Sequence, residues 1–289
     1  MPDHAHVTPP SHWPMIGCIA LVTTVLGGVN WLHGHAFGPY MFFTGLVILF
    51  YMMYGWFAEV IHENMAGLNE DKREDRSFRL SMFWFIFTEV MFFAAFFAAL
   101  FYARIITVPH IGGEAFHGMT HLLLWPEVHA TWPFLKVPDP YQYSVAHHAM
   151  PAWGLPVLNT LILLSSGLTI TIAHWGIVKG HHLRAVVAQI LTIILGMLFL
   201  YFQAVEYGEA YRHLGLRLDS GIYGTTFYML TGFHGLHVTV GTLMLMVILY
   251  RMLRKDFTAE HHFAFEGVAW YWHFVDVVWL FLFVFVYWL

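Results

Sequence analysis

Seven long apolar stretches constrain this chain more than any other feature of its sequence. They cover about 14–32, 39–62, 78–103, 152–178, 184–206, 222–250 and 264–288. A helix needs roughly 20 apolar residues to cross the ~30 Å hydrocarbon core of a bilayer, and each stretch is about that long or longer. Hydrophobic residues make up 58% of the 289-residue chain and charged residues only 11%, so a soluble fold could not bury them all. The sequence therefore predicts an all-α integral membrane protein with seven transmembrane helices.

Composition and motifs exclude several classes of protein. The apolar stretches are too long for the strands of a transmembrane β-barrel. The single cysteine, Cys18, excludes intrachain disulfides and thiolate metal clusters, and no basic patch points to a nucleic-acid partner. Walker loops, nucleophile elbows, HExxH and GxGxxG motifs are absent from the sequence. We therefore expect no catalytic residues and no metal site on this chain.

The most charged part of the chain, residues 69–79 (NEDKREDRSFR), separates the second apolar stretch from the third. We expect it to be a cytoplasmic loop between two domains, residues 1–68 with the first two helices and residues 80–289 with the other five. Residues 104–151 are rich in Pro, Gly and His and lack a helical apolar pattern. A segment of that length between two spans is expected to be a long external loop, with or without short helices.

Seven spans place the two termini on opposite sides of the membrane, and the Lys and Arg residues predict which side is which. With a cytoplasmic N-terminus, nine of these residues fall on the cytoplasmic side: Lys72, Arg73, Arg76, Arg79, Lys179, Arg184, Arg251, Arg254 and Lys255. Four fall on the outside: Arg104, Lys136, Arg212 and Arg217. Because cytoplasmic loops are enriched in Lys and Arg, the distribution predicts a cytoplasmic N-terminus and an external C-terminus.

Glu89 is the clearest ionisable residue at bilayer depth. It lies near the middle of the third apolar stretch, in FIFTEVMFFAAFF, and Phe85, Phe92 and Phe93 share its helix face. Inserting an ionisable side chain into the bilayer costs free energy, so its presence requires an explanation. Apolar surroundings favour the uncharged form of a carboxyl group. Glu89 is therefore either a proton-exchanging group or a protonated, hydrogen-bonded packing residue.

His234 and His237 stand three residues apart in TGFHGLHVTVGT and share a helix face. That spacing permits two metal ligands or haem ligation. A haem, however, normally takes ligands from opposite sides of its ring, on two helices. Thr231, Gly235 and Thr239 recur every four residues, which is typical of close helix packing in membranes. We favour histidines that hydrogen-bond to neighbouring helices.

The last apolar stretch carries Glu266, His273 and Asp276, which fall within an arc of about 80° on a helix. One face of this helix is therefore polar while the rest is aromatic. The face is either a proton relay or, as we favour, an inward surface that hydrogen-bonds to other helices.

Cations and an aromatic side chain gather at the expected cytoplasmic ends of the helices. Arg251 and Arg254 close the sixth stretch, His261 precedes the seventh, and Trp56 and Glu63 end the second. This combination suits an anionic phospholipid headgroup, or it is ordinary anchoring by positive residues on the inside.

Four stretches closely resemble subunit III of the haem-copper cytochrome c oxidases. They are SGIYGTTFYMLTGFHGLHVTVGT, HHFAFEGVAWYWHFVDVVWLFLF, FIFTEVMFF and LPVLNTLILLSSGLTITIAHW. The resemblance extends over nearly the whole chain, including the first two apolar stretches. Because the segment at 104–151 is longer than in mitochondrial forms, the chain resembles a bacterial member of the family.

The resemblance implies seven transmembrane helices, split two and five by a cleft that holds phospholipids. It implies no haem or copper on this chain, with both in the partner subunits. The family's buried carboxyl group, the one that hydrophobic carbodiimides modify, corresponds to Glu89. The family's lipid-headgroup residues correspond to Glu63, Arg251, Arg254, Phe257 and His261.

The function that the resemblance implies is that of a non-catalytic subunit of an aerobic terminal oxidase in the bacterial inner membrane. Such a subunit packs directly on subunit I, stabilises it and supports proton uptake during the reduction of oxygen to water. Subunit II, small accessory subunits and, indirectly, cytochrome c are further expected partners. The alternatives are a quinol oxidase subunit III or a nitric oxide reductase accessory subunit, which commonly lack the first two helices. An independent transporter and a haem-binding membrane cytochrome are the remaining alternatives.

Overall fold

The structure is a computed structural model that describes residues 11–65, 72–114, 117–124, 126, 128–137 and 141–289, with the backbone alone at 72–74. Over these residues the chain is helical and contains no strand. The helices are α1 (Trp13–Leu32), α2 (Gly38–Met65), α3 (Lys72–Phe101), η1 (Tyr102–Thr107), α4 (Val108–Ile111), α5 (Gly118–Leu124), α6 (Leu155–Val178), α7 (His182–Arg212), α8 (Gly221–Leu253), α9 (Phe263–Leu282) and η3 (Phe283–Trp288).

Seven helical segments are long and apolar enough to cross a membrane. They include the continuous helix at Asp75–Ile111, in which η1 and α4 extend α3, and the helix at Phe263–Trp288, in which η3 extends α9. The predicted all-α fold with seven transmembrane helices is confirmed.

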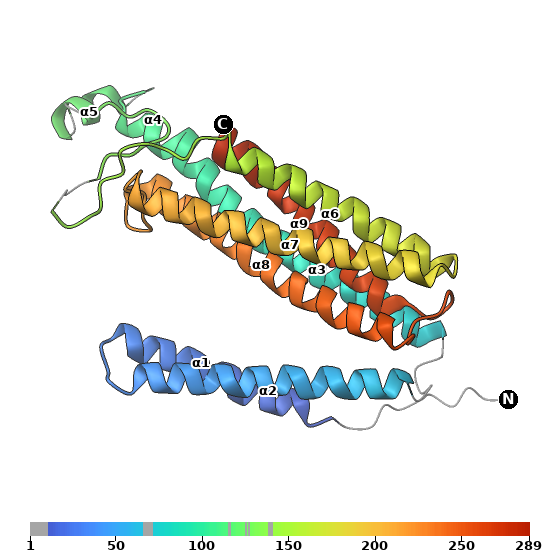
Figure 1. The fold of residues 1–289 in the computed structure, drawn as a ribbon. Helices are drawn as coiled ribbons and strands as arrows, with labels where there is room; N and C mark the ends of the chain where they lie inside the picture. Colours follow the sequence, from blue (N-terminus) through green and yellow to red (C-terminus); the bar gives the residue numbers. More distant parts are fainter. Residues whose placement is uncertain (1–10, 66–71, 115–116, 125, 127, 138–140) are drawn as a thin grey trace. The chain divides into compact units, whose positions relative to one another are not determined.

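The described residues up to Asp75 form one compact unit, which is the pair α1 and α2 (Figure 1). The two helices approach so closely that two glycines meet backbone atoms of the opposite helix. A Cβ atom added at Gly27 would overlap the backbone of Phe42, and one at Gly45 would overlap the backbone of Thr24. Small residues allow this approach, which gains van der Waals contact where no water is available to drive association.

Residues 76–289 form the second unit, a bundle in which α3, α6, α7, α8 and α9 run alongside one another (Figure 1). Two fully buried tryptophans of α9 fill its centre. The indole N–H of Trp272 donates to Ser166 Oγ at 2.9 Å, and that of Trp279 donates to Thr160 Oγ1 at 2.9 Å. Both acceptors lie on α6, so each large ring fills volume and also joins two helices.

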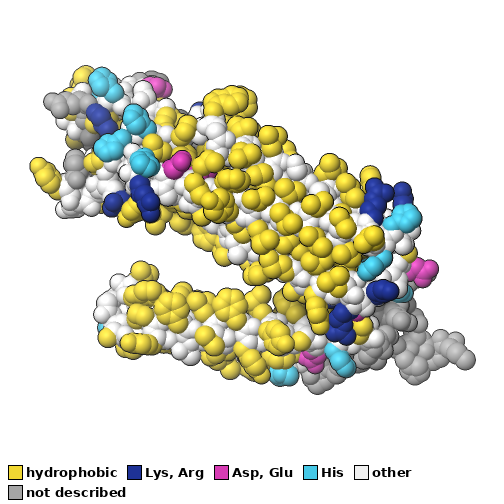
Figure 2. Space-filling model, viewed as in Figure 1, with side chains coloured by type: hydrophobic (Ala, Val, Ile, Leu, Met, Phe, Trp, Pro, Cys, Tyr) yellow, Lys and Arg dark blue, Asp and Glu magenta, His cyan; other side chains and the backbone are white. Residues whose placement is uncertain are grey.

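The outer surfaces of both units are rich in large apolar side chains. Figure 2 shows hydrophobic side chains over the long sides of the five-helix unit, with Lys, Arg and His gathered toward its two ends. Leu183, Leu168 and Tyr54 are among the side chains more than half exposed. Such a surface would aggregate in water, whereas lipid chains or other membrane subunits cover it in a bilayer.

Two predicted loop boundaries are wrong. Helix α3 begins at Lys72, so residues 72–79 are helical and not part of a loop, while residues 69–71 lie outside the described part of the chain. Charges of opposite sign at helical spacing, such as Asp75 and Arg79, support a water-exposed helical turn.

At its other end helix α3 continues, through η1 and α4, to Ile111, beyond the predicted start of the long segment at 104. There Arg104 lies over the ring of Trp132 at 5.9 Å, which keeps its charge beside an aromatic face.

The glycine contacts predict that the α1–α2 pair tolerates alanine at one position and not at its neighbour. Gly27→Ala forces the two backbones apart and is expected to destabilise the pair by about 1–3 kcal/mol, the usual cost of overpacking. Gly28→Ala is the matched control, because its added methyl group would lie 3.6 Å from the Phe42 ring, an ordinary contact. The fraction of solubilised protein that stays monodisperse after heating measures the difference. Equal losses for the two variants would contradict the packing described here.

Candidate functional site

A partly buried polar pair in the five-helix unit joins Glu89 of α3 to His237 of α8. His237 Nε2 and Glu89 Oε2 lie 2.9 Å apart. The other ring nitrogen, Nδ1, lies 2.7 Å from the carbonyl oxygen of Phe233, one turn earlier on α8. Because a carbonyl oxygen can only accept a hydrogen bond, Nδ1 carries a proton and donates it there.

This hydrogen-bond pattern fixes how many protons the pair shares. With Nδ1 protonated, the short contact between Nε2 and the carboxyl oxygen needs one further proton between them. That proton resides either on Glu89, with a neutral imidazole, or on His237, with a carboxylate. In both cases the pair has no net charge, which removes most of the cost of placing a carboxyl group inside an apolar bundle.

Aromatic rings enclose the pair. The ring centroids of Phe93, Phe92, Tyr271 and Phe274 lie 5.1, 6.1, 6.3 and 6.3 Å from that of His237. Phe92 and Phe93, two of the three rings expected beside Glu89, thus lie next to its partner His237, a partner that the sequence did not identify. The available signal was that both side chains are polar groups in the middle of apolar helices, and each of them requires a partner.

His234 forms its hydrogen bond with a different helix from His237. Its side chain is fully buried, Nε2 donates to the carbonyl oxygen of Val275 at 3.2 Å, and its ring packs against Phe199 and Trp279. The two histidines of the candidate ligand pair are thus turned toward α9 and α3. Both ring nitrogens of His237 contact protein groups, whereas His234 forms a hydrogen bond through Nε2 alone.

The polar face of α9 contacts α3 and α6. Glu266 Oε2 lies 2.7 Å from a guanidinium nitrogen of Arg79. His273 Nδ1 lies 3.3 Å from Asp276 Oδ2, one turn away, and its Nε2 lies 3.3 Å from the hydroxyl of Thr171 on α6. These contacts span separate levels of the helix, and no described hydrogen bond links Glu266 to His273.

The cationic residues at the end of α8 have unequal environments. Arg251 is buried, with Nε 3.6 Å from Asp256 Oδ2 and its guanidinium 4.8 Å from the ring centroid of Phe257. Arg254 is exposed, with Nε 4.0 Å from Asp256 Oδ1, and its Nη1 donates to the hydroxyl of Tyr250 at 3.4 Å. His261 is also exposed, and its backbone N–H donates to Thr258 Oγ1 at 3.0 Å. Arg251 therefore holds the connection between α8 and α9, whereas Arg254 presents its charge outward.

The remaining predicted lipid residues lie in the α1–α2 unit. Trp56 of α2 is 46% exposed and stacks on Phe57, and Glu63 is partly buried two residues before the end of the helix. Their neighbour Glu59 accepts a hydrogen bond from the indole of Trp13 on α1. The six residues predicted to bind phospholipid thus form two groups, one in each unit.

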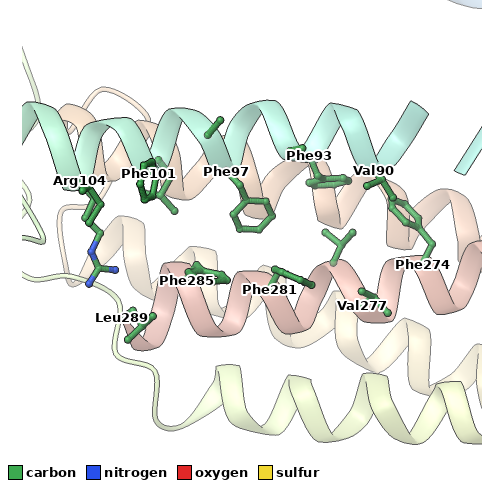
Figure 3. Close-up of a pocket in the computed structure, with 15 residues that line it drawn as sticks. Val90, Phe93, Phe97, Phe101, Arg104, Phe274, Val277, Phe281, Phe285 and Leu289 are labelled. Carbon is green, nitrogen blue, oxygen red and sulfur yellow. The ribbon is translucent and has the colours of Figure 1, made fainter. Parts of the chain in front are cut away.

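A large apolar groove runs between α3 and α9 (Figure 3). Its volume is about 700 Å³. Rings from both helices line it, namely Phe93, Phe97, Phe101, Phe274, Phe281 and Phe285. Arg104 stands at one end, so the groove offers space for hydrocarbon along its length and a positive charge at that end (Figure 3).

Comparison with known proteins identifies the family. The family model for cytochrome c oxidase subunit III matches residues 3–120 and 126–289. The chain belongs to the cytochrome c oxidase subunit III family. Cytochrome c oxidase subunit 3 of Squalus acanthias is 38% identical over 94% of this chain and 92% of that protein. The Arabidopsis thaliana protein of the same name is 39% identical over 94% and 91%. A probable cytochrome c oxidase subunit 3 of Rickettsia felis is 38% identical over 94% and 90%.

Membership in this family confirms the resemblance seen in the sequence. The chain is subunit III of a terminal oxidase, a multi-pass membrane component of an oxidoreductase complex in the respiratory chain. It therefore assembles with other oxidase subunits.

The Glu89–His237 contact predicts different effects for two substitutions. Glu89→Gln keeps a donor, because the carboxamide N–H can reach Nε2 once Nδ1 is bonded to Phe233. Glu89→Leu leaves Nε2 without a partner and is expected to cost about 1–3 kcal/mol, the usual penalty for an unsatisfied buried polar group. The thermal midpoint of the detergent-solubilised oxidase measures both. If the leucine variant were as stable as the glutamine variant, the hydrogen bond would not contribute to stability.

Proposed function

We propose that this chain is a non-catalytic subunit of an aerobic cytochrome c oxidase and carries no redox centre. Its role would be to stabilise subunit I and to support proton uptake during the reduction of oxygen to water. The observation that supports this proposal most strongly is that His234 and His237 are turned toward different helices. His234 Nε2 donates to Val275 of α9, and the two ring nitrogens of His237 contact Phe233 and Glu89. The two imidazoles therefore do not face a common ligand, and His237 has no ring nitrogen left for a haem iron.

The cytochrome c branch is favoured over the quinol oxidase and nitric oxide reductase branches. Helices α1 and α2 are present and form a packed pair, and the compared relatives are all named cytochrome c oxidase subunit 3. We assign haem and copper to the partner subunits, with subunit I in direct contact, subunit II and small accessory subunits nearby, and cytochrome c as an indirect partner.

The proposed location is the bacterial inner membrane, with the N-terminus in the cytoplasm and the C-terminus in the periplasm. The excess of Lys and Arg in the loops that this orientation places inside supports it. The Rickettsia relative supports a bacterial setting. In this orientation the groove end at Arg104 faces the periplasm, and Arg79, Arg251 and Arg254 face the cytoplasm.

Glu89 is proposed to act as a structural or buffering acid and not as part of a proton channel. A proton path needs polar groups that lead to both surfaces, and helix α3 offers few. The hydroxyl of its neighbour Thr88 donates to the carbonyl oxygen of Phe85 at 2.7 Å, so it is already engaged within the helix. The contact of Glu89 with His237, 2.9 Å long, supports a structural role for the carboxyl group. The Glu89→Gln variant is therefore expected to pump protons at close to the wild-type stoichiometry.

Gentle affinity purification from the native membrane tests the non-catalytic role. We expect a-type haem and copper to co-purify with larger subunits, and the optical haem spectrum to leave with those subunits when the complex is dissociated. Haem that stays with the isolated chain would overturn the proposal and return attention to His234 and His237. A chain that purifies alone and colourless would instead favour the transporter alternative.

Phospholipid binding at the cytoplasmic end is proposed to depend on Arg254, because its charge faces outward while Arg251 is occupied by Asp256 and Phe257. Arg254→Gln is expected to lower the affinity for anionic phospholipid roughly fivefold, as expected for one cation at a membrane surface. It should also speed inactivation during turnover. Arg254→Lys keeps the charge and is the matched control. Mass spectrometry of lipid that co-purifies with the oxidase measures the change, and equal lipid content in all three proteins would refute this role.

A further inference from the structure

A second polar cluster lies where α6 ends and α9 begins, and no function described above uses it. His174 is near the end of α6, His262 directly precedes α9, and Glu266 lies in the first turn of α9. Each side chain has one potential ligand atom, a ring nitrogen or a carboxylate oxygen, and these three atoms lie within 4.8 Å of one another. Residues from two helices are thus brought to one point by the packing of α6 against α9.

Each of the two imidazoles in this cluster has one ring nitrogen that makes no hydrogen bond with the described residues. Nε2 of His174 and Nδ1 of His262 are buried, and neither has a hydrogen-bond partner among the described residues. The ring centroids lie 5.2 Å apart, and the His174 ring stacks on Phe265 at 5.7 Å. Burying an unpaired polar atom costs about 1–3 kcal/mol, so a ligand that both neighbouring imidazoles can bind would be favourable here.

A cation would satisfy both nitrogens at once. Two imidazoles and one carboxylate are the ligand types that Zn²⁺ and similar transition-metal ions accept, whereas Ca²⁺ and Mg²⁺ prefer oxygen atoms. Ligand atoms on a tetrahedral Zn²⁺ with bonds of about 2.1 Å lie about 3.4 Å apart. The three atoms therefore need to approach one another by up to about 1.4 Å, which side-chain rotation can supply, and water would fill the fourth position.

The carboxylate of Glu266 already has a partner. Arg79 of α3 lies 2.7 Å from Oε2, and its guanidinium also lies over the ring of Phe263 at 5.2 Å. A divalent ion beside this guanidinium would be repelled by it, and both cations would compete for the same carboxylate. Binding of the ion and pairing with Arg79 are therefore alternative states of one site.

We propose that His174, His262 and Glu266 form a binding site for a divalent transition-metal ion of the zinc class, and that the ion competes with Arg79 for the Glu266 carboxylate. Binding would tie the end of α6 to the start of α9. It would at the same time weaken the contact that holds the first turns of α3 to α9.

Equilibrium dialysis of the detergent-solubilised, chelator-washed oxidase against ⁶⁵Zn²⁺ tests the site. His174→Ala is expected to remove one bound Zn²⁺ per complex, or to weaken that site more than about 100-fold, the upper limit for changes that merely support a ligand. His181→Ala is the matched control, because His181 is exposed and lies just after the same helix. Identical binding by the wild type and the His174→Ala variant would overturn the proposal.

The Arg79→Gln variant gives a second test, in which the expected result is opposite to the effect of misfolding. Removing the competing cation is expected to tighten Zn²⁺ binding about tenfold, whereas damage to the fold would weaken it. The double variant Arg79→Gln with His262→Gln should lose this gain. Affinity that is unchanged or weaker in Arg79→Gln would refute the competition with Arg79, and a gain that survives the loss of His262 would refute the ligand set. These two outcomes remain decisive even if His174→Ala fails to assemble.

Discussion

The five-helix unit depends on polar side chains that find partners on neighbouring helices inside an apolar bundle. In hydrocarbon an unpaired donor or acceptor costs several kcal/mol, so each such contact favours one alignment of the helices that it joins. Trp272 and Trp279 reach hydroxyl groups on α6, His234 reaches a backbone carbonyl on α9, and Glu89 reaches His237. Apolar packing is tolerant of sliding, whereas each of these contacts has a direction and therefore specifies how the helices are aligned.

The sequence was sufficient to predict the helices, because apolar length is a local property. It was less reliable at their ends. The charged residues after Met65 indicated a loop, yet the described part of that segment from Lys72 is helical, since opposite charges four residues apart support a helix as well as a loop does. The apolar residues Ile105 and Ile106 likewise extend a helix that Arg104 had been expected to end.

The partners of the site residues could not be predicted from the sequence, because they depend on how two helices are aligned. Glu89 and His237 are 148 positions apart, and nothing in either helix states which residue of the other lies opposite. The same limit affected the lipid residues. Arg251 and Arg254 look equivalent in the sequence, three residues apart at one helix end. The fold buries Arg251 beside Asp256 and Phe257, where it stabilises the loop between α8 and α9. Arg254 stays exposed, so its charge is accessible from outside the bundle.

Helix α3 is the element for which these contacts matter most. Its backbone does not approach α8 or α9 as closely as α6 approaches α7, and the apolar groove lined by Phe97 and Phe281 lies along one side of it. Long aromatic side chains and two polar contacts, Arg79 with Glu266 and Glu89 with His237, therefore carry its attachment. Because Glu89 has a full partner in the middle of the bundle, loss of the Arg79 contact at the end would loosen the first turns of α3 while its centre stays anchored.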